Sequence, residues 1–296
     1  MLFAVEPLSG LESPAVYQLR VRAKGASLPK IEFAKLSPQD KAYYTDRAWW
    51  DEMGKNPDNE IIEEKGWFQL VTPSSHSMLA NGVCRCELDA SEIDARIRKT
   101  IDFYRGRQQP FFWEISPSSR PVDLPARLEA AGFKKEMGHD GYVGDPAIVQ
   151  LPPPSAEVKV VPLTARYFDD WAKVMSHHYL VEPHALERLR KQVEHQHTKQ
   201  NHWIKHFVAL VNDEVVGIVQ ARYQHGYVLF LGASVRKEHR SRGVFPALFG
   251  ALIADAKKSG VGLIVAHVDH SALSPMYQKL GFERTCEYQT MVWRPH

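Results

Sequence analysis

The residues with the clearest chemical potential lie in a basic stretch at positions 235–245, VRKEHRSRGVF. It places Arg240, Arg242 and Gly243 between an expected strand and an expected helix. The first turn of a helix has unpaired N–H groups and a positive dipole end, which together attract phosphate. The arginines add charge, and the glycine lets the backbone approach a ligand. We therefore expect a pyrophosphate site here, although this loop alone leaves a basic surface turn as an equal alternative.

Two regular elements must hold this stretch in place. Residues 227–235 are mostly apolar, with β-branched and aromatic side chains, which predicts a buried strand. Downstream, apolar residues repeat at helical spacing from Val244 to Leu252. Lys257, Lys258 and Gly260 are typical of a helix end. The pattern predicts a strand, a basic loop and a helix in succession.

A second set of residues follows one strand later. Residues 262–269 predict another apolar strand, and a short helix then carries Tyr277 in the pattern Tyr-x-x-Leu-Gly-Phe. A last strand is expected from Cys286 to Trp293. Without further evidence, this tyrosine could be a half-buried packing residue.

Together these two motifs resemble the signatures of the GNAT superfamily of N-acetyltransferases. Arg240 and Gly243 fit its Arg/Gln-x-x-Gly-x-Gly/Ala loop, whereas Phe245 stands where the family usually has glycine or alanine. Tyr277 falls where the family usually keeps a tyrosine near the cofactor sulfur. His270 replaces the asparagine usually found seven residues before that tyrosine. The resemblance covers roughly residues 157–296.

The resemblance implies an α/β fold with a mixed, mostly antiparallel central sheet flanked by helices. It implies direct acetyl transfer from acetyl-CoA to an amine of a small molecule or protein, in a ternary complex. Tyr277 would protonate the leaving thiolate. The base would be Asp269 or His270, although either residue could instead cap the following helix. The cofactor-binding residues would be Ala233, Ser234, Val235, Arg240, Ser241, Arg242, Gly243, Val244, Phe245 and His270.

The acceptor itself is not predicted, because fold does not specify substrate. We expect its pocket to be lined by Trp171, His177, His178 and Tyr179. A catalytically inactive acyl-CoA-binding or interaction module remains an alternative, for which Phe245 and His270 are the reasons. An O-acyltransferase or a longer-chain acyltransferase on the same scaffold is a third reading.

The chain also contains an internal repeat. Gly132-Phe133 and Gly281-Phe282 are 149 residues apart, and residues 81–86 and 230–235 are strands at the same offset. We expect a degenerate unit at 1–149, a proline-rich linker at 150–156 and a catalytic unit at 157–296, as in tandem bacterial proteins of this family. The acidic stretch 87–93 lacks a glycine and would repel pyrophosphate. Leu128 stands opposite Tyr277, so we expect the first unit to be a structural partner that helps wall the acceptor site.

Composition narrows the remaining classes. The 296 residues suffice for two domains, and the net charge of +2 argues against a dedicated nucleic-acid binder. No apolar stretch approaches a membrane span, and the first residues lack a basic leader. Three cysteines cannot build a disulfide framework, which favours a reducing cytoplasm. Cys84-x-Cys86 and the histidines 195, 197, 202 and 206 are weak metal signals, so no metal is expected. A monomer or a homodimer is compatible with the sequence.

Overall fold

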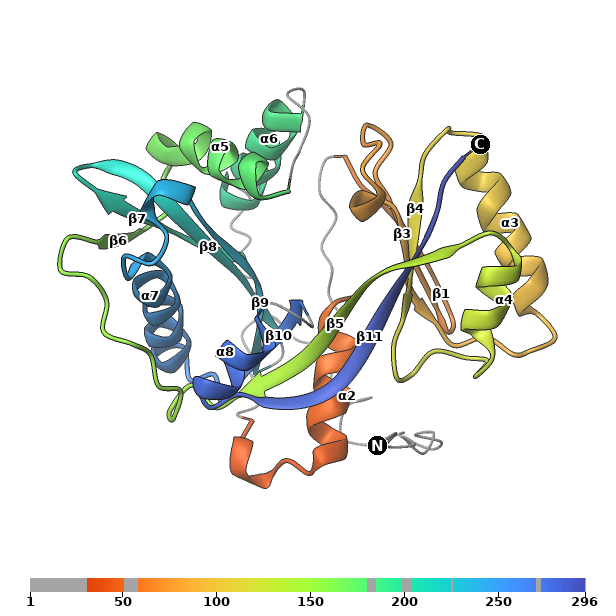
Figure 1. Cartoon of the computed structure of the whole chain (residues 1–296), viewed down its shortest axis with the longest axis horizontal. Coiled ribbons are helices and arrows are strands. Elements are labelled where there is room, and N and C mark those ends of the chain that lie inside the picture. The colour runs from red at the N-terminus through yellow and green to blue at the C-terminus, as the bar shows by residue number, and fades with distance from the viewer. Residues whose placement is uncertain are drawn as a thin grey trace.

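The computed structural model describes residues 31–50, 58–179, 185–198, 204–224, 226–269 and 273–295. These residues form one mixed eleven-stranded sheet flanked by helices (Figure 1). The strands are β1 (Glu60–Glu64), β2 (Trp67–Val71), β3 (Gly82–Cys86), β4 (Phe111–Ile115), β5 (Lys134–Gly144), β6 (Lys159–Pro162), β7 (Ile204–Val211), β8 (Glu214–Gln224), β9 (Tyr227–Val235), β10 (Leu263–Asp269) and β11 (Glu283–Trp293). The α-helices are α2 (Pro38–Ala48), α3 (Ile93–Arg105), α4 (Leu124–Ala130), α5 (Phe168–Tyr179), α6 (Ala185–Thr198), α7 (Val244–Lys258) and α8 (Ser274–Lys279).

The repeat predicted from the sequence is visible in the order of elements. The succession β1, β2, β3, α3, β4, α4, β5 recurs as β7, β8, β9, α7, β10, α8, β11. The bounds of β5 and β11 coincide when shifted by the 149-residue offset. In each copy one pair of strands is parallel, β3 with β4 and β9 with β10, and the other neighbours are antiparallel. The predicted mixed, mostly antiparallel α/β architecture is confirmed.

The two copies exchange their last strands. The sheet order is β1-β2-β3-β4-β11-β5-β10-β9-β8-β7-β6. Strand β5 of the first copy therefore lies between β10 and β11, and β11 of the second copy lies between β4 and β5. Figure 1 shows these two strands crossing the middle of the molecule together. The chain thus has one continuous sheet in place of two separate ones, and each copy is completed by the other.

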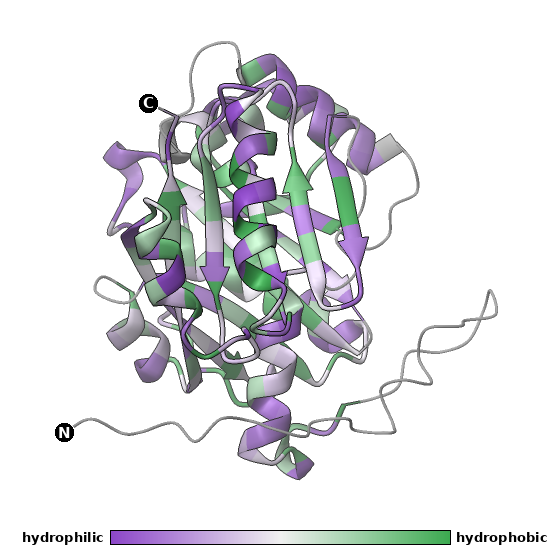
Figure 2. Ribbon diagram, turned by 90° about the vertical axis from the view of Figure 1, so that its right-hand side faces the viewer, coloured by the Kyte–Doolittle hydropathy of each residue, from purple (hydrophilic) through white to green (hydrophobic). Residues whose placement is uncertain are grey.

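The helices cover the sheet with the apolar faces that their sequences provide. In α7, Val244, Leu248 and Leu252 are buried against the sheet, as the helical spacing predicts. In α3, Ile93 and Ile97 are fully covered. Figure 2 views the molecule from the side of α3 and α4, where hydrophilic and hydrophobic stretches alternate along the helix in front. This alternation is the pattern of an amphipathic helix packed on a sheet.

Several element bounds differ from those expected. The sequence of residues 41–53 predicts a helix, but α2 begins at Pro38 because Ser37 and Asp40 form a capping box. The sequence of residues 89–107 also predicts a helix, and α3 spans Ile93–Arg105 within that range. Alternation at residues 17–22 predicts a strand, which lies outside the described residues. Strands β1, β5, β6, β7 and β8 were not expected.

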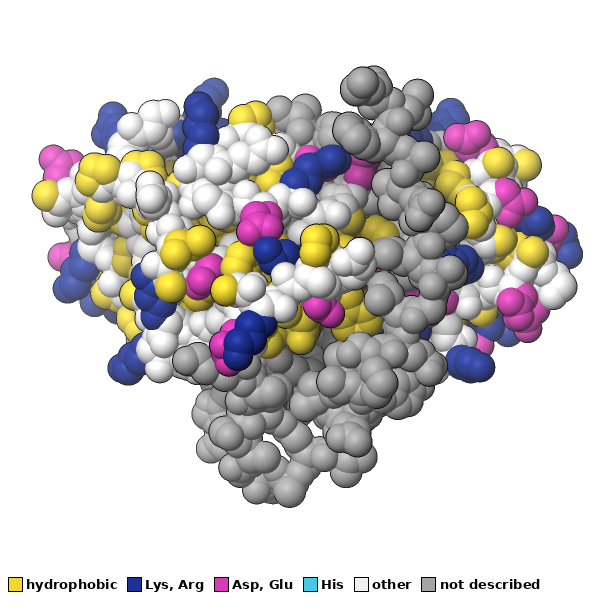
Figure 3. Space-filling model, turned by 90° about the horizontal axis from the view of Figure 1, so that it is seen from below, with side chains coloured by type: hydrophobic (Ala, Val, Ile, Leu, Met, Phe, Trp, Pro, Cys, Tyr) yellow, Lys and Arg dark blue, Asp and Glu magenta, His cyan; other side chains and the backbone are white. Residues whose placement is uncertain are grey.

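Helix α2 belongs to the first copy but packs against strands of both copies. It lies against β5, β10 and β11 below the centre of the sheet (Figure 1). The Arg222 guanidinium on β8 donates to the carbonyl oxygen of Trp49, 2.9 Å away, just after the helix. On the underside of the molecule, acidic and basic side chains of the described residues are interspersed (Figure 3). None of the helices in the described ranges is long and apolar enough to cross a membrane.

Candidate functional site

The parallel strands β9 and β10 separate partway along their length. They pair from Tyr227 with Leu263 to Phe230 with Ala266, and the pairing ends there. Beyond that point β9 pairs only with β8, and β10 pairs only with β5. A β-bulge between Phe230 and Gly232 coincides with the separation, and Gly232 has a φ of +137°. Because a bulge bends its strand, it turns β9 away from β10 and exposes part of its edge.

Three of the residues predicted to bind the cofactor lie on this separated part of β9. Ala233, Ser234 and Val235 follow the bulge directly and have no partner strand on the β10 side. The Ser234 side chain is buried, and its hydroxyl lies 3.4 Å from the Val174 carbonyl oxygen of α5. An edge of this kind presents backbone donors and acceptors that an amide-bearing ligand can pair with.

The basic loop after β9 presents a run of unpaired backbone donors. Within the described part of the chain, the N–H groups of residues 241–245 take part in no hydrogen bond. Ser241 and Gly243 have φ values of +60° and +76°, and Gly243 is the N-cap of α7. Such turns can collect successive N–H groups into an anion-binding concavity, here at a helix N-terminus. The backbone therefore fits a pyrophosphate group.

The side chains of the loop leave this backbone open. Arg240 and Arg242 are exposed, and the Arg240 Nε donates to the Val235 carbonyl oxygen, 3.1 Å away. The Phe245 ring stacks on Phe249 one turn along α7, with ring centroids 5.4 Å apart. The departure from glycine or alanine at position 245 therefore adds a ring that packs along the helix.

Gly243 is also in close contact with the proline-rich stretch that joins the two copies. A Cβ at position 243 would lie 2.7 Å from the backbone nitrogen of Ser155. Real Cβ atoms essentially never approach a neighbour so closely. A side chain at 243 is therefore opposed both by its positive φ and by the packing of residue 155.

Tyr277 lies beside the point where β9 and β10 separate. Its ring is 98% covered and packs against Phe230, Phe249, Phe282 and Tyr142. Phe230 is the last residue of β9 that pairs with β10. Burial raises the pKa of the Tyr277 hydroxyl well above its usual value, so the group keeps its proton at neutral pH. Among the described residues the hydroxyl has no hydrogen-bond partner.

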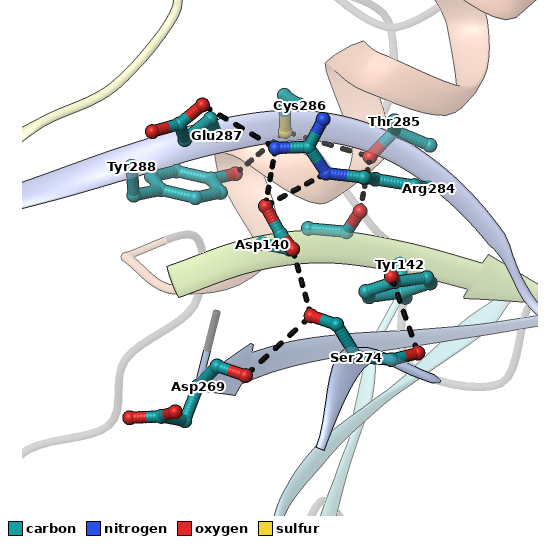
Figure 4. A network of polar contacts seen from close by, with 10 residues as sticks. Asp140, Tyr142, Asp269, Ser274, Arg284, Thr285, Cys286, Glu287 and Tyr288 are labelled. Carbon is teal, nitrogen blue, oxygen red and sulfur yellow. Dashed lines mark hydrogen bonds and ion pairs between the residues drawn. The ribbon is translucent and has the colours of Figure 1, made fainter. Parts of the chain in front are cut away.

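Of the two candidate bases, the structure describes only Asp269. Asp269 is exposed at the end of β10, and its backbone carbonyl, not its carboxylate, faces Ser274 of α8 (Figure 4). His270 lies outside the described residues. The structure therefore brings the unpaired edge of β9 at 233–235, the basic loop and Tyr277 together around the end of β9. Asp269 lies on the neighbouring strand β10.

The expectation for Trp171 is wrong. Trp171 is 1% exposed in the apolar core between α5, α6 and the sheet, where its ring contacts His206 edge-on at 5.5 Å. Its position on the apolar face of α5 buries it against β7 and β8, so it lines no pocket. Of the side chains of His177, His178 and Tyr179 nothing is described, although their backbone ends α5.

Polar residues of the first copy lie near Asp269 at the end of β10. The sequence did not indicate them as site residues. His139 of β5 is in register with Asp269, and its Nε2 lies 3.0 Å from Oε1 of Glu114. Its ring stacks on Tyr288 at 4.7 Å. Near it, His267 is half-buried, and desolvation of its imidazole lowers its pKa to about 3. Its Nε2 lies 2.9 Å from the Thr45 carbonyl oxygen, so neutral His267 carries the proton on Nε2.

The equivalent place in the first copy is closed by the chain itself. Parallel pairing of β3 with β4 ends at Val83 with Trp113, and the Arg120 backbone then bonds the end of β3, with its N–H 2.8 Å from the Cys86 carbonyl oxygen. The N–H groups of Glu92 and Ile93 both bond the Asp89 carbonyl oxygen. The end of the edge and the amides of Glu92 and Ile93, whose equivalents stay unpaired in the second copy, are thus paired here.

The cysteines and histidines form no recognisable metal centre in the described residues. No group of three or more His, Cys, Asp or Glu side chains there is arranged to hold a metal ion. Burial raises the pKa of Cys86 to about 12 and that of Cys286 to about 11, which keeps both as thiols. A thiol binds metal as its thiolate, which such burial disfavours.

Comparison with known proteins agrees with this geometry. Residues 166–282 match the model of the acetyltransferase (GNAT) family. Three solved structures share the fold at 13% sequence identity. A functionally unknown conserved protein from Staphylococcus epidermidis has a TM-score of 0.63, with 84% of this chain and 98% of that chain covered. A GCN5-related N-acetyltransferase from Kribbella flavida has a TM-score of 0.58, with 81% of this chain and 90% of that chain covered.

The third structure is a tandem GNAT protein from the clavulanic acid biosynthesis pathway. It has a TM-score of 0.57, with 86% of this chain and 87% of that chain covered. None of the curated proteins searched matches the sequence. The family match lies in the copy that holds the open edge, the unpaired amides and Tyr277. Residues 166–282 thus match the GNAT acetyltransferase family, and the chain as a whole shares its fold with a tandem GNAT protein.

Proposed function

We propose that this protein is an acetyl-CoA-dependent N-acetyltransferase with one cofactor site, in the second copy. The observation that carries the proposal is the run of unpaired N–H groups at 241–245, which continues from the unpaired edge of β9. These two features suit a ligand that combines a pyrophosphate with an amide-bearing arm. When bound, acetyl-CoA supplies the acetyl group as a thioester.

The residues of the chain then have separate tasks. The amides of 241–245 and the exposed Arg240 and Arg242 bind the pyrophosphate, and the edge at 233–235 orients the arm. Tyr277 holds a proton on its hydroxyl at neutral pH and donates it to the departing thiolate. Asp269 or His270 removes a proton from the amine, and an amine of a small molecule or protein is the acceptor.

The first copy has a structural part in this proposal. The end of its own edge and the amides of Glu92 and Ile93 are paired internally. Leu128, which stands where the second copy has Tyr277, is fully buried in an apolar core. Such a site offers neither pyrophosphate binding nor a proton donor. His139 of the first copy is in register with Asp269 in the sheet and contacts Glu114. This position supports a role for the first copy in forming a wall of the acceptor site.

Tyr277→Phe tests the enzyme hypothesis. General acid catalysis contributes about 10²- to 10⁴-fold, so turnover should fall by that order while the affinity for acetyl-CoA stays the same. The assay measures CoA thiol released with a panel of primary amines, and calorimetry measures binding. Acetyl-CoA binding without transfer to any amine would favour an inactive binding module. Unchanged turnover in Tyr277→Phe would remove the proposed proton donor.

A further inference from the structure

The helix that carries Tyr277 is held by the other copy of the repeat. Ser274 is the first residue of α8, three positions before Tyr277. Its Oγ donates to Oδ2 of Asp140 at 2.7 Å, and Asp140 lies on β5, 134 residues earlier in the chain (Figure 4). Tyr142 of the same strand reaches the carbonyl oxygen of Ser274 with its hydroxyl, 3.4 Å away. The hydroxyl and the carbonyl oxygen of one residue are thus both bound by β5.

Asp140 is itself fixed in a buried place. Its side chain is 3% exposed, and Oδ1 accepts from Nε of Arg284 on β11 at 2.7 Å. The hydrogen bond from Arg284 raises the pKa of that guanidinium, which therefore stays charged. A carboxylate bonded on both oxygens by a cation and a hydroxyl has little freedom to rotate. Asp140 can therefore hold the Ser274 hydroxyl in one place.

The orientation of Tyr277 has few other determinants. Among the described residues its hydroxyl is not hydrogen-bonded, and its ring is surrounded by aromatic rings. One of these rings is Tyr142, 5.8 Å away between centroids. Aromatic packing limits the tilt of a ring but lets it slide along its neighbours. Helix α8 has only six residues, so fixing Ser274 also fixes the start of Tyr277's own turn.

We propose that Asp140 and Tyr142 of the first copy are positioning residues for Tyr277. The exchange of strands thereby lets the degenerate copy influence the chemistry of the other copy through the placement of α8. This inference rests on the proposed function, because Tyr277 is its proton donor. Asp140 acts only through the placement of α8 and touches no reacting atom.

The first test observes Tyr277 itself and needs no acceptor. The protein is labelled with 3-fluorotyrosine, and the ¹⁹F resonance of residue 277 is assigned by its loss in Tyr277→Phe. Asp140→Ala and Ser274→Ala should each shift or broaden this resonance. Glu136→Gln should leave it unchanged. Glu136 is the matched control because it is a second β5 carboxylate paired with an arginine, Arg294, at the far end of the strand. If Asp140→Ala fails to fold, Ser274→Ala removes only one hydroxyl and decides alone.

The second test measures the coupling in catalysis. Displacing a catalytic group by about 1 Å can cost about 10²-fold, so Asp140→Ala should lower kcat by about 10- to 100-fold with the acetyl-CoA Kd within about twofold. In a Tyr277→Phe background the same change should alter kcat less than about twofold, because it has no proton donor left to misplace. An equal loss in both backgrounds, or an unmoved ¹⁹F resonance in the folded variants, overturns the proposal. Failure of the proposed function is separate: the wild type would then transfer acetyl to no amine, and the ¹⁹F test would still decide the positioning role.

Discussion

Substitution of Gly243 by alanine separates two structural demands on the pyrophosphate loop. The residue has a φ of +76°, and its Cβ would lie 2.7 Å from the backbone nitrogen of Ser155. A left-handed conformation costs a non-glycine residue about 1–2 kcal/mol. Overpacking against backbone costs about 1–3 kcal/mol more. Gly243→Ala should therefore lower the free energy of unfolding by about 2–5 kcal/mol.

Gly260→Ala is the matched control at the other end of the same helix. Gly260 has a φ of +71°, and a Cβ there would meet nothing within 4 Å. Its substitution should cost only the conformational part, about 1–2 kcal/mol. Urea unfolding followed by tryptophan fluorescence measures both variants. Equal losses for the two variants would refute the packing of Ser155 on the loop. A larger loss for Gly243→Ala, with weakened acetyl-CoA binding, would support it.

Other predictions concern pH and the exchanged strands. Burial lowers the pKa of His206 and that of His267 to about 3 in the folded protein. As the pH falls below 6.5, the two histidines are therefore protonated in the unfolded chain while they stay neutral in the folded one, which favours unfolding. At pH 5 each histidine should reduce the free energy of unfolding by about 2 kcal/mol. His267→Gln should therefore make the free energy of unfolding depend less on pH. His76→Gln, at an exposed position, is the control and should leave this pH dependence unchanged. Fragments 1–149 and 157–296 should each fail to fold alone, since each lacks the strand that the other supplies, and should give a native circular dichroism spectrum when mixed. A cooperatively folded single fragment would contradict the interlocked sheet.

The sequence predicted the segment from β9 to β11 well because its local signals agree with its tertiary structure. Strand 227–235 matches β9, and the helix from Val244 with Gly260 at its end matches α7. Periodicity, a positive-φ glycine and terminal lysines all act within a few residues. The same holds for the repeat, which the spacing of the two Gly-Phe pairs disclosed.

The exchange of β5 and β11 could not be predicted in the same way. Two strands of equal length at a fixed offset indicate a repeat, but either one could pair within its own copy or across. That choice depends on long-range contacts, such as Asp140 with Arg284, 144 residues apart. The role of Ser274 was likewise hidden, because its partner lies in the other half of the chain. Trp171 was misplaced for a related reason: an aromatic residue on a helix can face a pocket or a core.

Calorimetric titration of acetyl-CoA tests the central claim most directly. The wild type should bind one molecule per chain. Arg240→Glu with Arg242→Glu should weaken binding by about 10³-fold, since two charge-assisted contacts worth about 1.5–3 kcal/mol each are lost. Lys257→Glu with Lys258→Glu, at the opposite end of α7, is the matched control and should bind as the wild type does. Two molecules per chain, no binding, or binding that survives the arginine changes would contradict a single cofactor site at the loop before α7.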